Sequence, residues 1–116
     1  MTESGTKSAH ERRRFERVEV DYAAKVRVTD TKGQLLGNVR QIGRGGIAIE
    51  PEKEFKRDRK LKVVISDPSE KIRFQVNVTV RYASARQVGL EFRDLDAEAA
   101  VDVGILIGKY YEKAAE

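Results

Sequence analysis

The sequence contains no cysteine and no tryptophan, and its 116 residues include only one histidine and two prolines. Without cysteine the chain has no disulfide framework, no thiolate metal site and no cysteine nucleophile. The single histidine, His10, stands in a polar leader with no Asp or Glu at metal-ligand spacing, so zinc sites and Ser-His-Asp triads lack their components. We therefore expect a protein that is not an enzyme and that holds no metal or cofactor.

Long apolar segments are also absent from the sequence. No run approaches the roughly 20 residues that a membrane-spanning helix needs, and residues 1–9 lack the hydrophobic centre of a signal peptide. A chain of 116 residues is long enough for one modest core but not for two. Together with the missing cysteines, these observations predict a single soluble domain in a reducing cytoplasm.

Positive charge is concentrated near the N-terminus. The net charge is only +4, yet residues 11–18 read Glu-Arg-Arg-Arg-Phe-Glu-Arg-Val and contain four arginines. This cluster either solvates the N-terminus or binds a local anionic partner. Arg13 and Arg17 are four positions apart with Arg12 beside them, so an arm that carries them can present several planar guanidinium groups to one ligand. Such groups bind phosphate bidentately, pair with the O6 and N7 edge of guanine and stack on bases.

Strand-like alternation fills most of the chain after the polar leader. Residues 1–10 show no hydrophobic periodicity, and we expect them to form a disordered tail. Alternating apolar and polar residues predict strands at residues 18–29, 35–42, 47–51, 61–65, 72–82 and 88–92. About six strands joined by short turns, followed by one C-terminal helix, predict a mainly β fold, either an antiparallel barrel or a sandwich with a helical lid.

From Asp96 onward the apolar period becomes helical. Asp96 is a suitable N-cap, and Glu98 lies in the first turn, where the helix dipole favours negative charge. Val101 and Ile105 recur at helical spacing with Gly108. This apolar face is widened by Ile107, Tyr110 and Tyr111. The pattern predicts that the face packs over a barrel mouth, with self-association as a homodimer as the alternative.

A glycine-rich turn follows the second predicted strand, where residues 41–46 read Gln-Ile-Gly-Arg-Gly-Gly. One interpretation is structural, because glycine lets one strand bulge or reverse into the next. The other is a ligand site, because backbone N–H groups without Cβ bulk can approach a phosphate or a base edge, and Arg44 adds positive charge. The segment matches neither a Walker motif nor a dinucleotide-binding fingerprint.

Together these features resemble the PilZ domain family. The residues that carry the resemblance are Arg12-Arg13 followed by Arg17, the turn that ends at Gly46, the Ile47-Ala48-Ile49 strand behind it, Val88 to Phe92, and the closing helix. The similarity covers residues 11–116, which we take as one PilZ-like domain after the tail. It implies a six-stranded antiparallel β-barrel with a C-terminal α-helix and a flexible N-terminal arm that wraps the bacterial second messenger cyclic di-GMP.

The first of the family's two ligand motifs is complete in this chain. The RxxxR motif is present as Arg13 and Arg17, with Arg12 directly before it. The resemblance implies that Arg13 and Arg17 grip guanine and phosphate, and that Arg12 assists.

The second family motif, Asp or Asn followed by x-Ser-x-x-Gly, is altered. With Gly46 on the final glycine, the acidic or amide position falls on Gln41 and the serine position on Gly43. The lost charge and the lost hydroxyl each cost about 1 kcal/mol. Together they predict a site roughly thirtyfold to hundredfold weaker. The candidates for compensation are Arg44 and the backbone N–H groups of the glycine turn.

The sequence therefore predicts a stand-alone cyclic di-GMP receptor or adaptor that passes the signal to a partner protein by contact. The alternative is a degenerate PilZ-like interaction module that binds no nucleotide. A general DNA or RNA binder ranks third, because only Phe15 stands among the arginines as a stacking residue.

Overall fold

A computed structural model describes residues 17–115 of the chain. The predicted tail and the arm residues Arg12 and Arg13 lie outside the described residues. The elements are β1 (Val18–Glu19), β2 (Arg27–Thr29), β3 (Leu35–Ile42), β4 (Gly46–Pro51), β5 (Lys60–Asp67), the 3-10 turn η1 (Pro68–Glu70), β6 (Ile72–Ala83), β7 (Val88–Arg93) and α2 (Ala97–Ala115).

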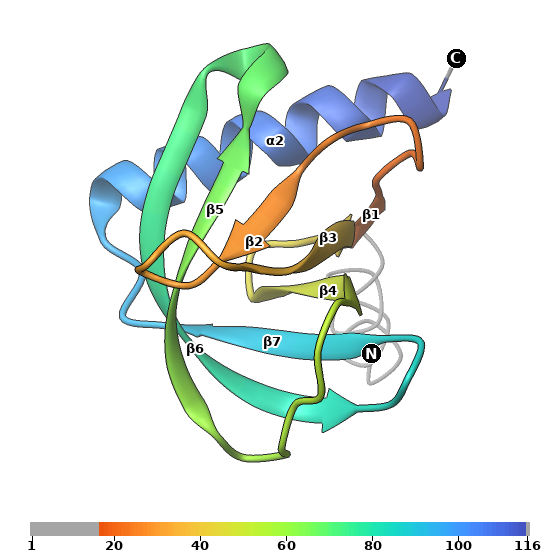
Figure 1. Ribbon diagram of the computed structural model, residues 1–116. Coiled ribbons are helices and arrows are strands. Elements are labelled where there is room, and N and C mark those ends of the chain that lie inside the picture. Colours follow the sequence, from red (N-terminus) through yellow and green to blue (C-terminus); the bar gives the residue numbers. More distant parts are fainter. Residues whose placement is uncertain (1–16, 116) are drawn as a thin grey trace, which may run out of the picture.

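Six of the strands form a closed antiparallel barrel (Figure 1). The hydrogen-bonded order β3-β2-β5-β6-β7-β4 returns from β4 to β3, and β1 adds two residues to the part of the β3 edge that β2 leaves free. Closure satisfies the strand edges within the barrel instead of leaving them to pair with another chain. The predicted mainly β fold, a six-stranded barrel with a C-terminal helix, is confirmed.

The first predicted strand, residues 18–29, is wrong in its middle. The amide of Val20 donates to the carbonyl of Arg40 at 2.8 Å, and the amide of Val39 donates to the carbonyl of Val26 at 2.8 Å. Val39 and Arg40 are neighbours on β3, but their partners Val26 and Val20 are six positions apart in the sequence. The chain between Val20 and Val26 leaves the barrel wall as a loop, and one predicted strand becomes β1 and β2.

Local hydrogen bonding explains this loop. The carboxylate of Asp21 accepts from the amide of Ala23 at 3.1 Å, a turn-forming contact that competes with strand pairing. Tyr22, which the alternating pattern places inside, is 75% exposed. The guanidinium of Arg40 instead lies over the Tyr22 ring, 4.0 Å from its centroid.

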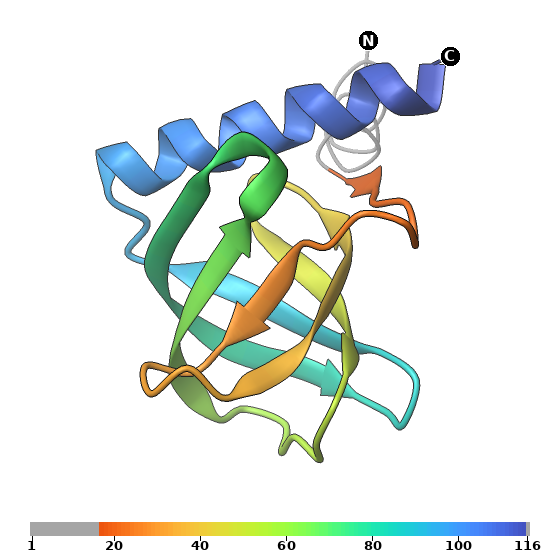
Figure 2. The same cartoon turned by 45° about the horizontal axis from the view of Figure 1, so that its top comes forward.

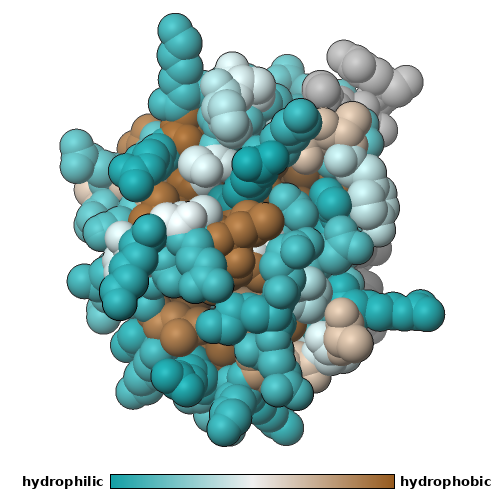
Figure 3. All heavy atoms as spheres, viewed as in Figure 1, coloured by the Kyte–Doolittle hydropathy of each residue, from teal (hydrophilic) through white to brown (hydrophobic). Residues whose placement is uncertain are grey.

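The barrel interior is filled by the inward side chains of all six strands. On β6 the predicted buried set is confirmed for Ile72, Phe74, Val76, Val78 and Val80. Tyr82 continues that alternation in sequence but is 38% exposed, because the pairing of β6 with β7 shifts register between Val80 and Tyr82. Polar side chains cover most of the face shown in Figure 3, as expected for a chain with 36% charged residues.

Helix α2 lies across one end of the barrel (Figure 2), and its predicted N-cap is confirmed, since the Asp96 carboxylate accepts from the amide of Ala99 at 2.8 Å. The predicted packing face is wrong in part. The buried stripe is Ala99, Val103, Leu106 and Tyr110. Val101 and Ile105 face solvent, with 61% and 45% exposure. Apolar residues surround this helix on most sides, so periodicity alone does not select the buried stripe. Self-association through the outer face stays a prediction.

A buried carboxylate fixes α2 to the barrel. Asp67, only 1% exposed, accepts from the amide and hydroxyl of Ser69 at 3.0 and 2.7 Å, from Lys109 Nζ at 3.0 Å and from the Tyr110 hydroxyl at 2.9 Å. Burial alone would raise the pKa of Asp67, but hydrogen bonds from these three partners and the Lys109 charge outweigh it and hold the pKa below its ordinary value. Asp67, the last residue of β5, thereby binds Lys109 of the helix, which lies 42 residues later in the sequence.

Candidate functional site

A hollow of about 280 Å³ lies where β3, β4, β6 and β7 meet on the barrel surface. It is lined by Arg17, Gln41, Ile42, Gly43, Gly45, Gly46, Ile47, Ala48, Arg81, Tyr82, Gly89, Leu90 and Glu91. Four of these are glycines and one is alanine, so little side-chain volume covers the strands there. The hollow exists because small residues gather on one patch of the sheet.

Two of the glycines are required by close packing. A Cβ on Gly46 would overlap the carbonyl oxygen of Leu90 on the neighbouring strand β7. A Cβ on Gly89 would overlap the ring of Tyr82, its partner across β6 and β7. The missing side chain at Gly89 therefore lets the Tyr82 ring lie flat beside the hollow.

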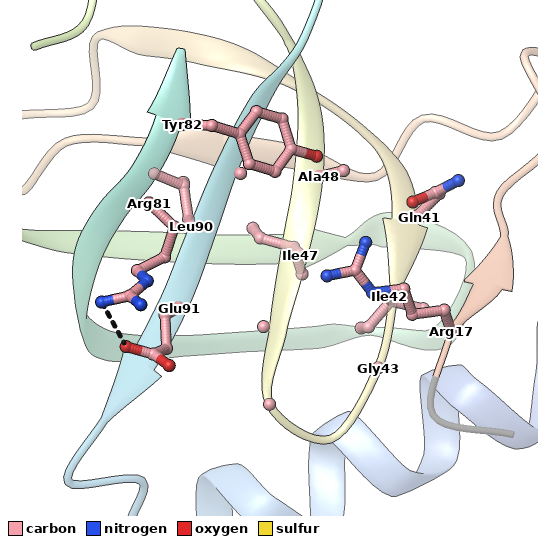
Figure 4. Close-up of a pocket in the computed structure, with 13 residues that line it drawn as sticks. Arg17, Gln41, Ile42, Gly43, Ile47, Ala48, Arg81, Tyr82, Leu90 and Glu91 are labelled. Atoms are coloured by element: carbon pink, nitrogen blue, oxygen red, sulfur yellow. Dashed lines mark ion pairs between the residues drawn. The ribbon is translucent and has the colours of Figure 1, made fainter. Parts of the chain in front are cut away.

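Charged and polar groups surround this small-residue floor (Figure 4). The guanidinium of Arg17, the residue just before β1, reaches toward the middle of the hollow, and the Tyr82 ring lies at the opposite rim. Arg81 and Glu91 form an exposed ion pair at 3.7 Å on the wall made by β6 and β7. The Tyr82 hydroxyl accepts from the side-chain amide of Gln87 at 2.7 Å, which holds the ring in place.

Gln41 is held by a residue outside the hollow. Its Nε2 donates to Glu19 Oε2 at 2.6 Å, and the two residues are direct partners across β1 and β3. Glu19 does not line the hollow, but it does line the neighbouring depression that Gln41 also borders. Gln41 thus lies between the hollow and the neighbouring depression.

The structure brings four of the predicted site residues together. Arg17, Gln41, Gly43 and Gly46 all line the same hollow. Arg44 is exposed on the turn between β3 and β4 and is not among the lining residues. That turn is closed by the Gly43 amide, which donates to the carbonyl of Gly46 at 2.9 Å. The predicted role of Arg44 in compensating for the altered motif stays a prediction.

Sequence reasoning missed the wall on the far side of the hollow. Arg81, Tyr82 and Glu91 come from β6 and β7, at least 35 positions after the glycine turn. The available signal was Gly89 inside the predicted strand at residues 88–92, because a glycine within a strand indicates close approach of another group. The alternating pattern instead placed Tyr82 in the core.

A second polar cluster places the Lys109 amine beside a hydroxyl and a carboxylate. Lys109 Nζ donates to the hydroxyl of Ser69 beside Asp67. Burial alone would lower the pKa of Lys109, but its interactions with Asp67 and Tyr110 together outweigh this and raise the pKa. Through the bonds from Lys109 and Tyr110 to Asp67, this cluster anchors α2 to the barrel.

Two further findings apply to residues 17–115. No group of three or more His, Cys, Asp or Glu side chains there is arranged to hold a metal ion. No helix in that part of the chain is long and apolar enough to cross a membrane.

Comparison with known families gives a direct match. The family model described as PilZ domain matches residues 11–107, most of the chain. The chain belongs to the PilZ domain family. PilZ domains are typically non-catalytic receptor or adaptor domains, and the family binds cyclic di-GMP. No curated protein matches the sequence.

Solved structures share the PilZ fold. The uncharacterised Legionella protein Lpg0364 has a TM-score of 0.61 at 8% identity, covering 86% of this chain and 98% of its own. The PilZ domain of CeSA, from a cellulose-synthesizing bacterium, has a TM-score of 0.61 at 15% identity, covering 80% of this chain and 95% of its own. The Bacillus subtilis inhibitor of motility MotI/DgrA has a TM-score of 0.58 at 16% identity, covering 85% of this chain but only 50% of its own. At these identities the likeness concerns the fold alone.

Proposed function

We propose that this PilZ domain is a cyclic di-GMP receptor or adaptor, without catalytic activity, that works in the bacterial cytoplasm and relays the signal to a partner protein. The observation that carries the proposal is the placement of Arg17, the last residue of the RxxxR motif, with its guanidinium over the same hollow that Gln41 and the glycine turn line. A planar cation and a polar acceptor on a floor of small residues suit a ligand with both phosphate and guanine groups.

The dimensions of the hollow indicate how much of the ligand it holds. Its volume of about 280 Å³ lies at the low end of the roughly 300–1,000 Å³ typical of ligand pockets. The hollow thus suits one guanine and its adjacent phosphate, with the Tyr82 ring as a stacking face. The remaining half of the ligand would lie over the opening, where Arg12 and Arg13 would meet it.

Titration calorimetry with cyclic di-GMP tests this function. We expect wild-type protein at tens of micromolar to give heat, and the double variant Arg13→Ala, Arg17→Ala to bind at least about a hundredfold more weakly, since each charge-assisted contact contributes about 1.5–3 kcal/mol. The matched control is Arg27→Ala with Arg73→Ala, which removes two exposed arginines that do not line the hollow.

Two results would overturn the assignment. The first is the absence of heat with wild-type protein. The second is binding that survives loss of Arg13 and Arg17. A steep salt dependence shared with unrelated single-stranded DNA would point to general nucleic-acid binding instead.

A specific observation supports the second candidate function, a PilZ-like interaction module that binds no nucleotide. Val101, Ile105 and Tyr111 leave an exposed apolar strip on the outer face of α2, with open space over Gly104 and Gly108. Such a strip suits contact with a protein or with a second copy of the chain. Under this alternative, Ile105→Asp would abolish partner capture while cyclic di-GMP would have no effect.

A further inference from the structure

The contact between Glu19 and Gln41 determines which chemical group the hollow presents to a base. A carboxylate can only accept hydrogen bonds, so the part of the Gln41 side chain that faces Glu19 at 2.6 Å must be the NH₂ group. The carbonyl oxygen is then left on the side of the hollow, and Figure 4 shows it there. The orientation of the Gln41 amide is therefore set by its partner Glu19 and is not an arbitrary assignment of its oxygen and nitrogen atoms.

Strand pairing keeps the two side chains together. Glu19 and Gln41 are opposite residues of the β1–β3 ladder, and β1 contains only two residues. Arg17 directly precedes β1, so the pairing that holds Glu19 beside Gln41 also holds the backbone next to Arg17. The pairing of β1 with β3 therefore places both Arg17, beside the hollow, and Glu19, behind Gln41.

We propose that Glu19 is a positioning residue that fixes Gln41 as a hydrogen-bond acceptor and thereby makes the site select guanine over adenine. The guanine edge offers two adjacent donors, N1–H and N2–H₂, whereas adenine offers only the N6–H₂ donor beside N1, an acceptor that the Gln41 carbonyl cannot pair. The inference rests on the proposed function, because it concerns the nucleotide in the same hollow. It also offers a reason why a neutral amide can occupy the family's acidic position: Glu19 polarises it from behind.

Affinities for cyclic di-GMP and cyclic di-AMP, which carry identical phosphates, test the inference. We expect wild-type protein to prefer cyclic di-GMP by about fivefold to 150-fold, since an acceptor left unpaired costs roughly 1–3 kcal/mol. Glu19→Ala frees the amide to turn its NH₂ group toward adenine. That variant should therefore bind cyclic di-GMP about fivefold to tenfold more weakly and narrow the preference by at least a similar factor.

The exchange Glu19→Gln with Gln41→Glu provides the rescue. It keeps one NH₂ donor facing one carboxylate but puts the carboxylate on the side of the hollow, so the preference for cyclic di-GMP should return or increase. Gln41→Glu alone sets two carboxylates against each other and should not rescue. Glu54→Ala, an exposed glutamate that does not line the hollow, should leave both affinities unchanged.

The outcomes separate the two proposals. If wild-type protein binds cyclic di-GMP and Glu19→Ala weakens both nucleotides equally, Glu19 acts only through stability or charge and this inference is overturned while the proposed function stands. If wild-type protein binds neither nucleotide, the proposed function is overturned and the inference falls with it.

Discussion

Asp67→Asn should lower the free energy of unfolding by about 3 kcal/mol, since breaking a buried ion pair leaves one charge without its partner. The carboxylate has four hydrogen bonds, two from Ser69 and one each from Lys109 and Tyr110. An asparagine offers one acceptor oxygen, and its NH₂ group would face donors. Lys109, with 18% of its side chain exposed, would lose its buried counter-charge.

Urea unfolding followed by circular dichroism measures this loss. The matched control is Glu70→Gln, which removes the other carboxylate near Lys109, at 3.4 Å but 38% exposed. Its expected effect is below about 1 kcal/mol, as for solvent-exposed ion pairs. If Asp67→Asn cost no more than this control, the helix anchor described above would be wrong.

The same carboxylate predicts an acid limit to stability. In the folded protein the pKa of Asp67 lies below its ordinary value of 3.8, so the unfolded chain binds the proton more readily. Its stabilisation is therefore present above about pH 4 and is lost as the pH falls through the folded pKa. The difference in unfolding free energy between wild type and Asp67→Asn should stay constant from about pH 5 to 8 and shrink below about pH 4. A difference that grows in acid would contradict the predicted sign.

Gly46→Ala is expected to destabilise the barrel by about 3 kcal/mol, the upper part of the usual range for overpacking. The added Cβ would overlap the Leu90 carbonyl oxygen and lie 3.1 Å from the Cα of Glu91. Both are backbone atoms of β7, so no rotamer change relieves the contact. Only separation of β4 from β7 would relieve it, and these strands also form the floor of the hollow.

The neighbouring glycine supplies a matched control for this variant. A Cβ on Gly45 meets no atom within 4 Å, so Gly45→Ala should change the thermal unfolding free energy by less than about 0.5 kcal/mol. If the two substitutions lowered the unfolding free energy equally, the close contact between Gly46 and β7 would not be the cause of the destabilisation. The comparison also bears on function, because lost ligand binding in Gly46→Ala would reflect barrel damage and not a missing ligand contact.

Most strands could be predicted from local pattern. The bounds predicted for residues 35–42 match β3, and the alternation from Ile72 to Val80 matches the buried face of β6. These segments have one face in the core and one in solvent, so alternation in sequence records burial directly. The N-cap at Asp96 was also predictable, because the amide that it accepts from is only three residues away in the sequence.

The errors occurred where a distant part of the chain decides the outcome. The loop after Val20 depends on which residues of β3 the chain meets, and the exposure of Tyr82 depends on a register shift against β7. The buried stripe of α2 was decided by the barrel end and by Asp67, which binds Lys109 and Tyr110. Helical periodicity carries none of this information.

For the candidate site, the sequence alone predicted three motifs: the RxxxR arginines, the altered position at Gln41 and the glycine turn before Gly46. Each is a short-range motif, readable because its residues are close in sequence. Only the tertiary structure decided that Arg17 and Gln41 share a hollow with Tyr82 and Glu91, and that Glu19 orients the amide of Gln41. The barrel pairs β4 with β7, and a contact between strands so far apart in sequence leaves no periodic pattern in the sequence.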